Sequence, residues 1–181
     1  MKFLASVLTL AASVALLPAG LAQVSADAAK KPIPSPPAQA TVELSGKQIT
    51  IDYSAPSMRG RKIFGGLLPY DHWWRTGANA ATTLTTPIDL KIGTATVPAG
   101  TYTLYSLPSE TTWKLIINKQ TKQWGTVYNE SQDLARVDMQ KNPLPDPQEK
   151  MSISFENTQG NQTQLHVRWE NTDVWVPVVA Q

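Results

Sequence analysis

The stretch DYSAPSMRGRKIFGGLLPYDHWWRTGAN, residues 52–79, interrupts a chain that otherwise alternates between apolar and polar residues. It mixes arginines and tryptophans with glycines and prolines, and no alternation survives within it. A long segment of this kind inside a compact domain is usually functional, because its backbone groups need specific partners. The sequence therefore predicts that this loop carries the site and that the flanking segments form the scaffold.

Alternation with a period of two flanks the loop on both sides. Before it, Ile49, Ile51 and Tyr53 follow a glycine-containing turn at residues 45–46 and predict half of a β-hairpin. After it, the alternation returns at residues 81–92, 101–107, 113–118, 135–139, 151–155, 165–169 and 174–178. No window of helical length has apolar residues three and four apart. This pattern predicts an all-β fold of roughly eight to ten strands, an antiparallel β-sandwich or jelly-roll-like domain.

The size of the chain is suited to a single core. Its 181 residues are 41% apolar, so we predict one β-sandwich domain at residues 41–181. Within this domain, NPLPDPQ at residues 142–148 carries three prolines. Proline lacks the backbone N–H that strand pairing uses, so a linker is expected there in place of a strand.

The N-terminus has the features of an export signal. Lys2 precedes an apolar run from Phe3 to Leu17, and small residues follow Pro18. Residues 1–22 are therefore predicted to be a signal peptide that sends the protein to the periplasm or outside the cell. Residues 23–40, rich in proline, alanine and lysine, are predicted to be a disordered spacer. No later segment could cross a membrane as a helix.

Composition excludes several kinds of chemistry. The net charge of +2 is spread along the chain, which argues against nucleic acid as a partner. With no cysteine, thiolate metal sites and cysteine nucleophiles are excluded. The only histidines are His72 and His166, and no cluster has zinc-ligand spacing. We therefore expect no metal and no cofactor. His166, between Leu165 and Val167 on a strand, is expected to face solvent.

Three segments carry a family resemblance. They are residues 52–66, with DYSAPSMRGRKIFGG, residues 74–79, with WRTGAN, and residues 98–104, with PAGTYTL. In this order they resemble an exported bacterial family catalogued as domain of unknown function 2911, across almost the whole mature chain. The resemblance implies a secreted, β-rich domain and brings with it no activity, ligand or catalytic residue.

The candidate ligand-binding residues lie in the loop and in a second irregular stretch at residues 119–133. They are Arg59, Arg61, Lys62, His72, Trp74, Arg75, Asn79, Trp124 and Tyr128. Guanidinium groups match carboxylates and phosphates, although these cations could also pair with Asp52, Asp71 or Glu43 to hold the loop shut. The tryptophans could hold sugars or plug the end of the sandwich.

These residues favour a non-catalytic module that binds a small anionic molecule or a glycan, with no catalytic residue assigned. Two alternatives stay open. One is an enzyme of an unrecognised class that uses His72 with Asp71 or Asp52. The other is a structural envelope protein that associates through its sheet edges. The sequence does not predict the oligomeric state.

Overall fold

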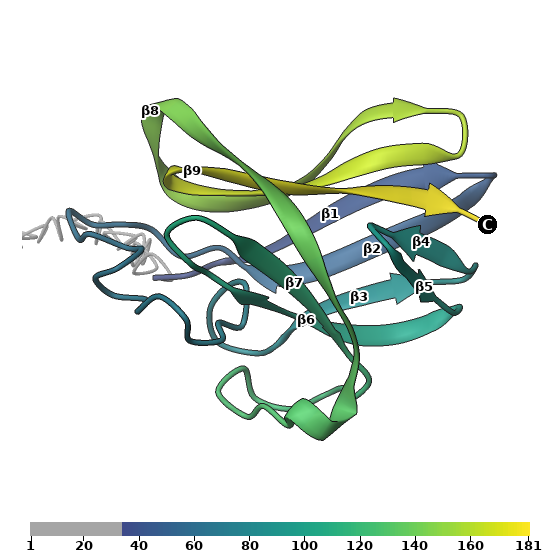
Figure 1. The fold of residues 1–181 in the computed structure, drawn as a ribbon, viewed down its shortest axis with the longest axis horizontal. Coiled ribbons are helices and arrows are strands. Elements are labelled where there is room, and N and C mark those ends of the chain that lie inside the picture. Colours follow the sequence, from purple (N-terminus) through teal and green to yellow (C-terminus); the bar gives the residue numbers. More distant parts are fainter. Residues whose placement is uncertain (1–33) are drawn as a thin grey trace, which may run out of the picture. The chain divides into compact units, whose positions relative to one another are not determined.

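The computed structural model describes residues 34–181, so the predicted signal peptide and most of the predicted spacer lie outside the described residues. This part of the chain contains nine strands, which Figure 1 labels in chain order. They are β1 (Pro37–Leu44), β2 (Lys47–Ser54), β3 (Thr82–Thr86), β4 (Leu90–Ile92), β5 (Ala95–Val97), β6 (Gly100–Leu107), β7 (Trp113–Asn118), β8 (Asp133–Gln159) and β9 (Gln162–Ala180). A short 3-10 turn, η1 (Glu130–Gln132), precedes β8. The predicted antiparallel all-β fold is confirmed.

Two layers of strands share the long strand β8. One layer has the order β1-β2-β3-β6-β7 and ends on the first part of β8, which pairs with β7. The other contains the remainder of β8 with β9, β4 and β5. Figure 1 shows β8 crossing from the first layer to the second. No helix in residues 34–181 is long and apolar enough to span a membrane.

Strand β9 bends back on itself, which places its two halves close together. The bend falls at Glu170, whose φ of 53° is in the left-handed region. Asn161, just before β9, accepts a hydrogen bond from the backbone N–H of Ala180 at its far end, at 2.8 Å. As a result, side chains seven residues apart in β9 can meet on the outer face of the sheet.

The core lies between the layers and follows the alternation in the sequence. Strand β2 has buried apolar side chains at every second position, with Ile49 and Ile51 fully buried, whereas the central strands β6 and β7 are buried on both faces over most of their length. Opposite them, β9 contributes Leu165, Val167 and Trp169. The predicted hairpin before the loop is confirmed as β1 paired with β2 around the turn at residues 45–46.

Two predicted boundaries differ from the structure. Strand β1 begins at Pro37, so residues 37–40, predicted as spacer, belong to the sheet, and Ala40 is buried in the core. Proline is tolerated there because it occupies the first position of the strand. The predicted linker at residues 142–148 lies within β8. Its prolines appear as a shift in register, from Pro143 opposite Thr172 to Gln148 opposite Glu170.

Candidate functional site

The long loop between β2 and β3 is tied to the opposite layer of the sandwich. Met58 N–H donates to the carbonyl oxygen of Glu149 at 2.8 Å, and Met151 N–H donates to that of Pro56 at 2.9 Å. The carboxylate of Glu149 accepts from the N–H of Arg59 at 2.9 Å. The first part of the loop therefore continues the pairing of β8 instead of lying free.

A second carboxylate holds the middle of the loop. Glu170, at the bend of β9, accepts from the N–H groups of Ile63 and Phe64 at 2.9 and 3.2 Å. This contact positions Phe64 at the end of the core. There its ring packs edge-to-face against Trp113, with centroids 4.8 Å apart. Part of the loop thus closes the sandwich, as the structural alternative for its aromatic residues predicted.

Trp74 takes part in this closure. It is buried, stacks on Trp169 with centroids 5.8 Å apart, and donates its indole N–H to the carbonyl oxygen of Gly77 at 3.1 Å. Thr76, two residues on, is fully buried with a φ of 49°, a conformation that β-branched residues rarely adopt. Its hydroxyl lies 2.7 Å from that of Ser106. This strained segment holds Arg75 at the mouth of a pocket.

We call this cavity the loop pocket. It has a volume of about 370 Å³ and lies between the loop, β9 and the residues before β1. It is lined by Ser35, Pro56, Arg61, Leu67, Leu68, Trp74, Arg75, Gly77, Ala78 and Trp169. Its walls are apolar apart from one serine and two guanidinium groups, and no carboxylate lines it.

Neither guanidinium of the loop pocket is neutralised by a carboxylate of residues 34–181. Arg61 donates to the carbonyl oxygens of Met58 and Ser57, both at 2.8 Å. The Nε of Arg75 is buried and has no hydrogen-bond partner among the described residues. The alternative that these arginines hold the loop shut through Asp52, Asp71 or Glu43 is therefore wrong for this part of the chain. Glu149 and Glu170 hold the loop through backbone N–H groups.

Four predicted site residues line neither the loop pocket nor the second cavity. Arg59 and Asn79 donate to the carbonyl oxygens of Pro34 and Ser35, at 3.3 and 3.2 Å, and so hold the chain that leads into β1. Lys62 is exposed and lines no cavity described here. Trp124 is 58% exposed and also lines neither the loop pocket nor the second cavity.

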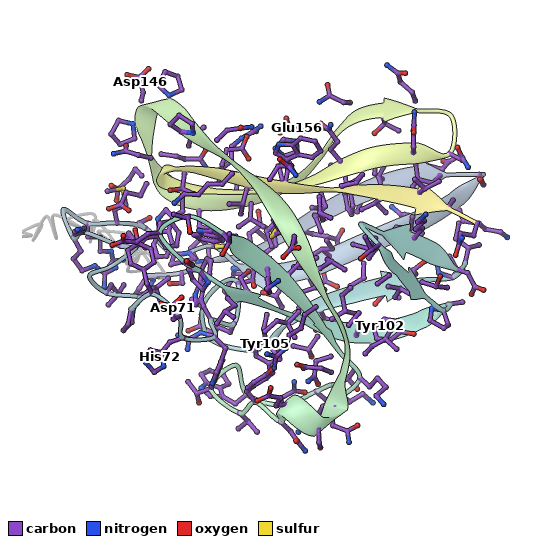
Figure 2. All side chains as sticks on the ribbon, in the orientation of Figure 1. Asp71, His72, Tyr102, Tyr105, Asp146 and Glu156 are labelled. Carbon is purple, nitrogen blue, oxygen red and sulfur yellow. The ribbon has the colours of Figure 1, made fainter. Side chains whose placement is uncertain are left out.

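The other two predicted residues, His72 and Tyr128, line a second cavity of about 220 Å³, which we call the platform cavity. It is lined by Asp71, His72, Trp73, Leu107, Ile116, Tyr128, Glu130 and Arg136. Figure 2 shows Asp71 and His72 projecting from the loop at the outer edge of the fold. Of the nine predicted residues, three therefore line the loop pocket, two line the platform cavity and four line neither.

A hydrogen-bonded network fixes one wall of the platform cavity. Tyr128 donates its hydroxyl to Asp133 at 2.7 Å, and Arg136 donates to Tyr128 and to Asp133, both at 2.8 Å. Burial and the hydrogen bond to Asp133 raise the pKa of Tyr128 far above its usual value. The hydrogen bond to Asp133 also raises the pKa of Arg136. Tyr128 thus remains a neutral donor at physiological pH.

The geometry gives no support to a general base at His72. Its side chain makes no hydrogen bond to Asp71, to Asp52 or to any other residue in the described range. Asp52 instead accepts from Gln39 at 2.7 Å on the outer face of the β1–β2 hairpin. A catalytic base needs a partner that orients its ring, and none is present among these residues.

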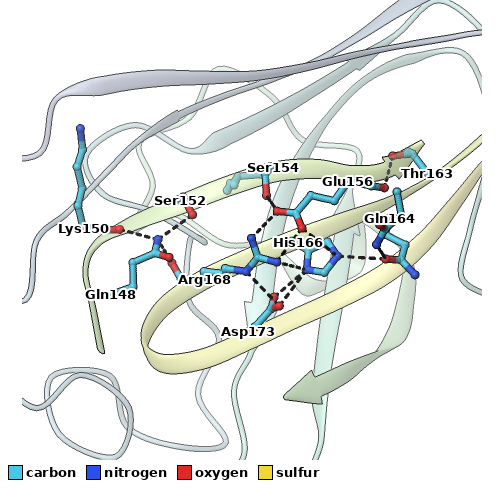
Figure 3. Close-up of polar contacts among 12 residues, drawn as sticks. Gln148, Lys150, Ser152, Ser154, Glu156, Thr163, Gln164, His166, Arg168 and Asp173 are labelled. Atoms are coloured by element: carbon cyan, nitrogen blue, oxygen red, sulfur yellow. Dashed lines mark hydrogen bonds and ion pairs between the residues drawn. The ribbon is translucent and has the colours of Figure 1, made fainter. Parts of the chain in front are cut away.

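The prediction for His166 is wrong. It points to the outer face of the sheet, yet it is only 5% exposed. Its Nδ1 donates to Asp173 at 2.8 Å, and its ring stacks on Trp175 with centroids 5.9 Å apart. Arg168 bridges Asp173 and Glu156 beside it (Figure 3). The bend of β9 brings residues 166 and 173 together, and local alternation carries no sign of that bend.

The comparisons with known proteins identify the family. Residues 35–178 match a family described as "Protein of unknown function (DUF2911)". The chain belongs to the DUF2911 family. The searches of curated proteins and of solved structures found no match. Two segments that carry the DUF2911 resemblance, residues 52–66 and 74–79, provide most of the residues that line the loop pocket, whereas residues 98–104 lead into β6.

Several lining residues were not among the predicted candidates. Ser35 lies in the segment that the sequence predicts as spacer, and the strand alternation of residues 165–169 predicts that Trp169 faces the core. Leu67 and Leu68 lie next to the motif residues, and their position between Gly66 and Pro69 was the one available signal. Nothing in the sequence marks Arg136 as part of a cavity, because outward-facing arginines are common on strands.

Proposed function

We propose that this DUF2911 protein is an exported, non-catalytic binding module whose loop pocket holds a small anion with an apolar body. One observation carries the proposal: two guanidinium groups without carboxylate partners in residues 34–181 border a cavity with apolar walls. Guanidinium groups recognise carboxylates and phosphates with paired, charge-assisted hydrogen bonds.

The buried Nε of Arg75, which has no hydrogen-bond partner among residues 34–181, supports an anionic ligand. A buried N–H without a partner costs free energy, and such groups are usually satisfied by water, an ion or a ligand. The stem of Arg75 lies close to the backbone of Gly125, where an added Cβ would lie only 2.3 Å from its Cδ. This contact fixes the guanidinium before a ligand arrives, which reduces the entropy cost of binding.

The walls of the loop pocket suit the apolar part of the ligand. Leu67, which is 47% exposed, and Leu68 border the cavity on one side, and the stacked rings of Trp74 and Trp169 border it on the other. A volume of about 370 Å³ is at the lower end for small-molecule sites. The ligand class is therefore a short aliphatic or aromatic carboxylate or phosphate ester.

Binding of matched pairs tests the proposal. Isothermal titration calorimetry compares octanoate with octanol and phenyl phosphate with phenol, and we expect only the anions to bind. Replacing Arg75 with methionine keeps the apolar stem and removes the charge, which should weaken binding at least about tenfold. Arg59→Met is the control, because Arg59 lies outside the loop pocket.

Two results would contradict the proposal. One is equal binding of the neutral and the anionic member of each pair. The other is equal loss of affinity in the Arg59 and Arg75 variants. Arg75→Lys adds a further check, because a lysine keeps the charge but cannot form a bidentate contact, and an intermediate affinity is expected.

Export is part of the same proposal. The signal-like order of residues 1–22 supports it. Mass spectrometry of the protein expressed from its full-length gene in a bacterial host should find a chain that begins at Gln23 or at Asp27 in the fraction outside the cytoplasm. An unprocessed chain confined to the cytoplasm would refute export without affecting the loop pocket.

A further inference from the structure

The platform cavity shares no lining residue with the loop pocket, and the proposed function makes no use of it. Its lining includes Trp73, an indole that is 37% exposed. The same lining contains the polar side chains of Asp71, His72, Glu130 and Arg136, so the cavity offers an aromatic ring next to hydrogen-bonding groups, the combination that small-molecule sites use. We propose that this cavity binds one ring of a neutral, hydroxyl-rich carbohydrate.

Trp73 is held in a fixed orientation by two tyrosines. Its ring lies 4.9 Å from that of Tyr128 and meets the ring of Tyr105 edge-to-face at 5.5 Å. Tyr105 donates its hydroxyl to the carbonyl oxygen of Val127 at 2.6 Å, and Tyr128 is bonded to Asp133. Because its supports are anchored, the indole forms a rigid platform against which the C–H face of a pyranose can stack.

Planar polar groups surround the platform. Arg136 forms an ion pair with Glu130 at 2.7 Å and donates to Asp133 and Tyr128, so its guanidinium is oriented before a ligand arrives. Asp71 has a backbone φ of 61°, and its N–H donates to the carbonyl oxygen of Pro108 at 2.8 Å. The side chain of Asp71, like that of His72, makes no hydrogen bond to residues 34–181. Both side chains are therefore available to a ligand.

The charges of the lining favour a neutral ligand. An anion would meet the carboxylates of Asp71 and Glu130, and a cation would meet the guanidinium of Arg136. Hydroxyl groups avoid both conflicts, since each can donate to a carboxylate and accept from a guanidinium or an imidazole. The volume of about 220 Å³ leaves room for a single sugar ring rather than a longer buried chain.

Binding of the full-length exported protein to short neutral oligosaccharides tests the proposal. The probes are cellotetraose, xylotetraose and mannotetraose, with choline as a cationic probe and glucuronate as an anionic one. We expect saturation-transfer NMR to detect binding of at least one neutral probe. Trp73→Ala should weaken it about tenfold, because the stacking surface is lost. The control is Trp124→Ala, which removes an exposed tryptophan outside both cavities.

A second variant separates binding from folding. Asp71→Asn keeps the size of the side chain, and asparagine tolerates the positive φ, so this variant should fold and still bind the sugar more weakly. Arg59→Met should leave sugar binding unchanged, because Arg59 is exposed and lines neither cavity. The proposal is overturned if no neutral probe binds, if choline or glucuronate binds more tightly than every sugar, or if Trp73→Ala and Trp124→Ala have equal effects.

Discussion

Replacing Glu170 with alanine should destabilise the protein and loosen the loop that carries Arg61. The carboxylate accepts two backbone N–H groups, from Ile63 and Phe64, at 2.9 and 3.2 Å. Ile63 is fully buried and Phe64 is 4% exposed, so water cannot replace the lost acceptor without opening the loop. The positive φ of Glu170 does not affect the difference in stability between the wild type and Glu170→Ala, because alanine also carries a Cβ.

The size of the effect follows from these two contacts. A hydrogen bond to a charged group contributes about 1.5–3 kcal/mol, and two bonds to one carboxylate are not fully additive. We therefore expect Glu170→Ala to lower the free energy of unfolding by about 2–4 kcal/mol. Glu170→Gln keeps one acceptor oxygen without the charge and should cost about half as much.

Urea denaturation followed by tryptophan fluorescence measures this change. The midpoint should fall while the slope stays constant, because the surface exposed on unfolding is unchanged. Asp146→Ala is the matched control, since Asp146 is an exposed carboxylate of β8 with no hydrogen bond to residues 34–181. A Glu170→Ala variant as stable as this control, within about 0.5 kcal/mol, would refute the role of Glu170 as the clamp of the loop.

Three further predictions concern other parts of the sandwich. The hydrogen bond from Arg168 lowers the pKa of Glu156 from 4.5 to about 2, so ionised Glu156 stabilises the fold above pH 4.5 and loses this effect as the pH falls toward 2. Glu156→Gln should therefore lower the free energy of unfolding by about 1–2 kcal/mol at pH 7, allowing for partial exposure, and by almost nothing at pH 2. Urea titrations at both pH values measure this, and an equal loss of stability at both would contradict the prediction. Gly125→Ala places a Cβ 2.3 Å from the Cδ of Arg75, so it should lower the free energy of unfolding by about 1–3 kcal/mol and abolish anion binding. An unchanged anion affinity in isothermal titration calorimetry would contradict the contact. Trp113→Ala removes a fully buried ring and should cost about 3–5 kcal/mol by urea denaturation, and a cost below about 1 kcal/mol would place Trp113 outside the core.

The local pattern of the chain was sufficient for the strands and for the position of the irregular loop. Ile49 and Ile51 predicted a buried face because alternation along a strand is a property of neighbouring residues. The prolines at residues 142–148 were read locally as a break, whereas β8 continues through them with a shift in register. The break in hydrogen bonding is real, because β8 turns beside Asp146 (Figure 2) and its pairing with β9 resumes only at Gln148.

The sequence by itself determined an antiparallel all-β domain with one long loop rich in arginine and tryptophan. Only the tertiary structure decided that the loop borders two cavities, that Arg75 and Trp169 line the same cavity, and that His166 is buried against Asp173. The physical reason is that apolar–polar alternation indicates which side chains are buried. Which residue each buried side chain contacts depends instead on the packing of strands that are far apart in the chain. Residues 75 and 169 line one cavity because the loop is held against β9 by Glu170, and the sequence has no periodic pattern that would indicate that contact.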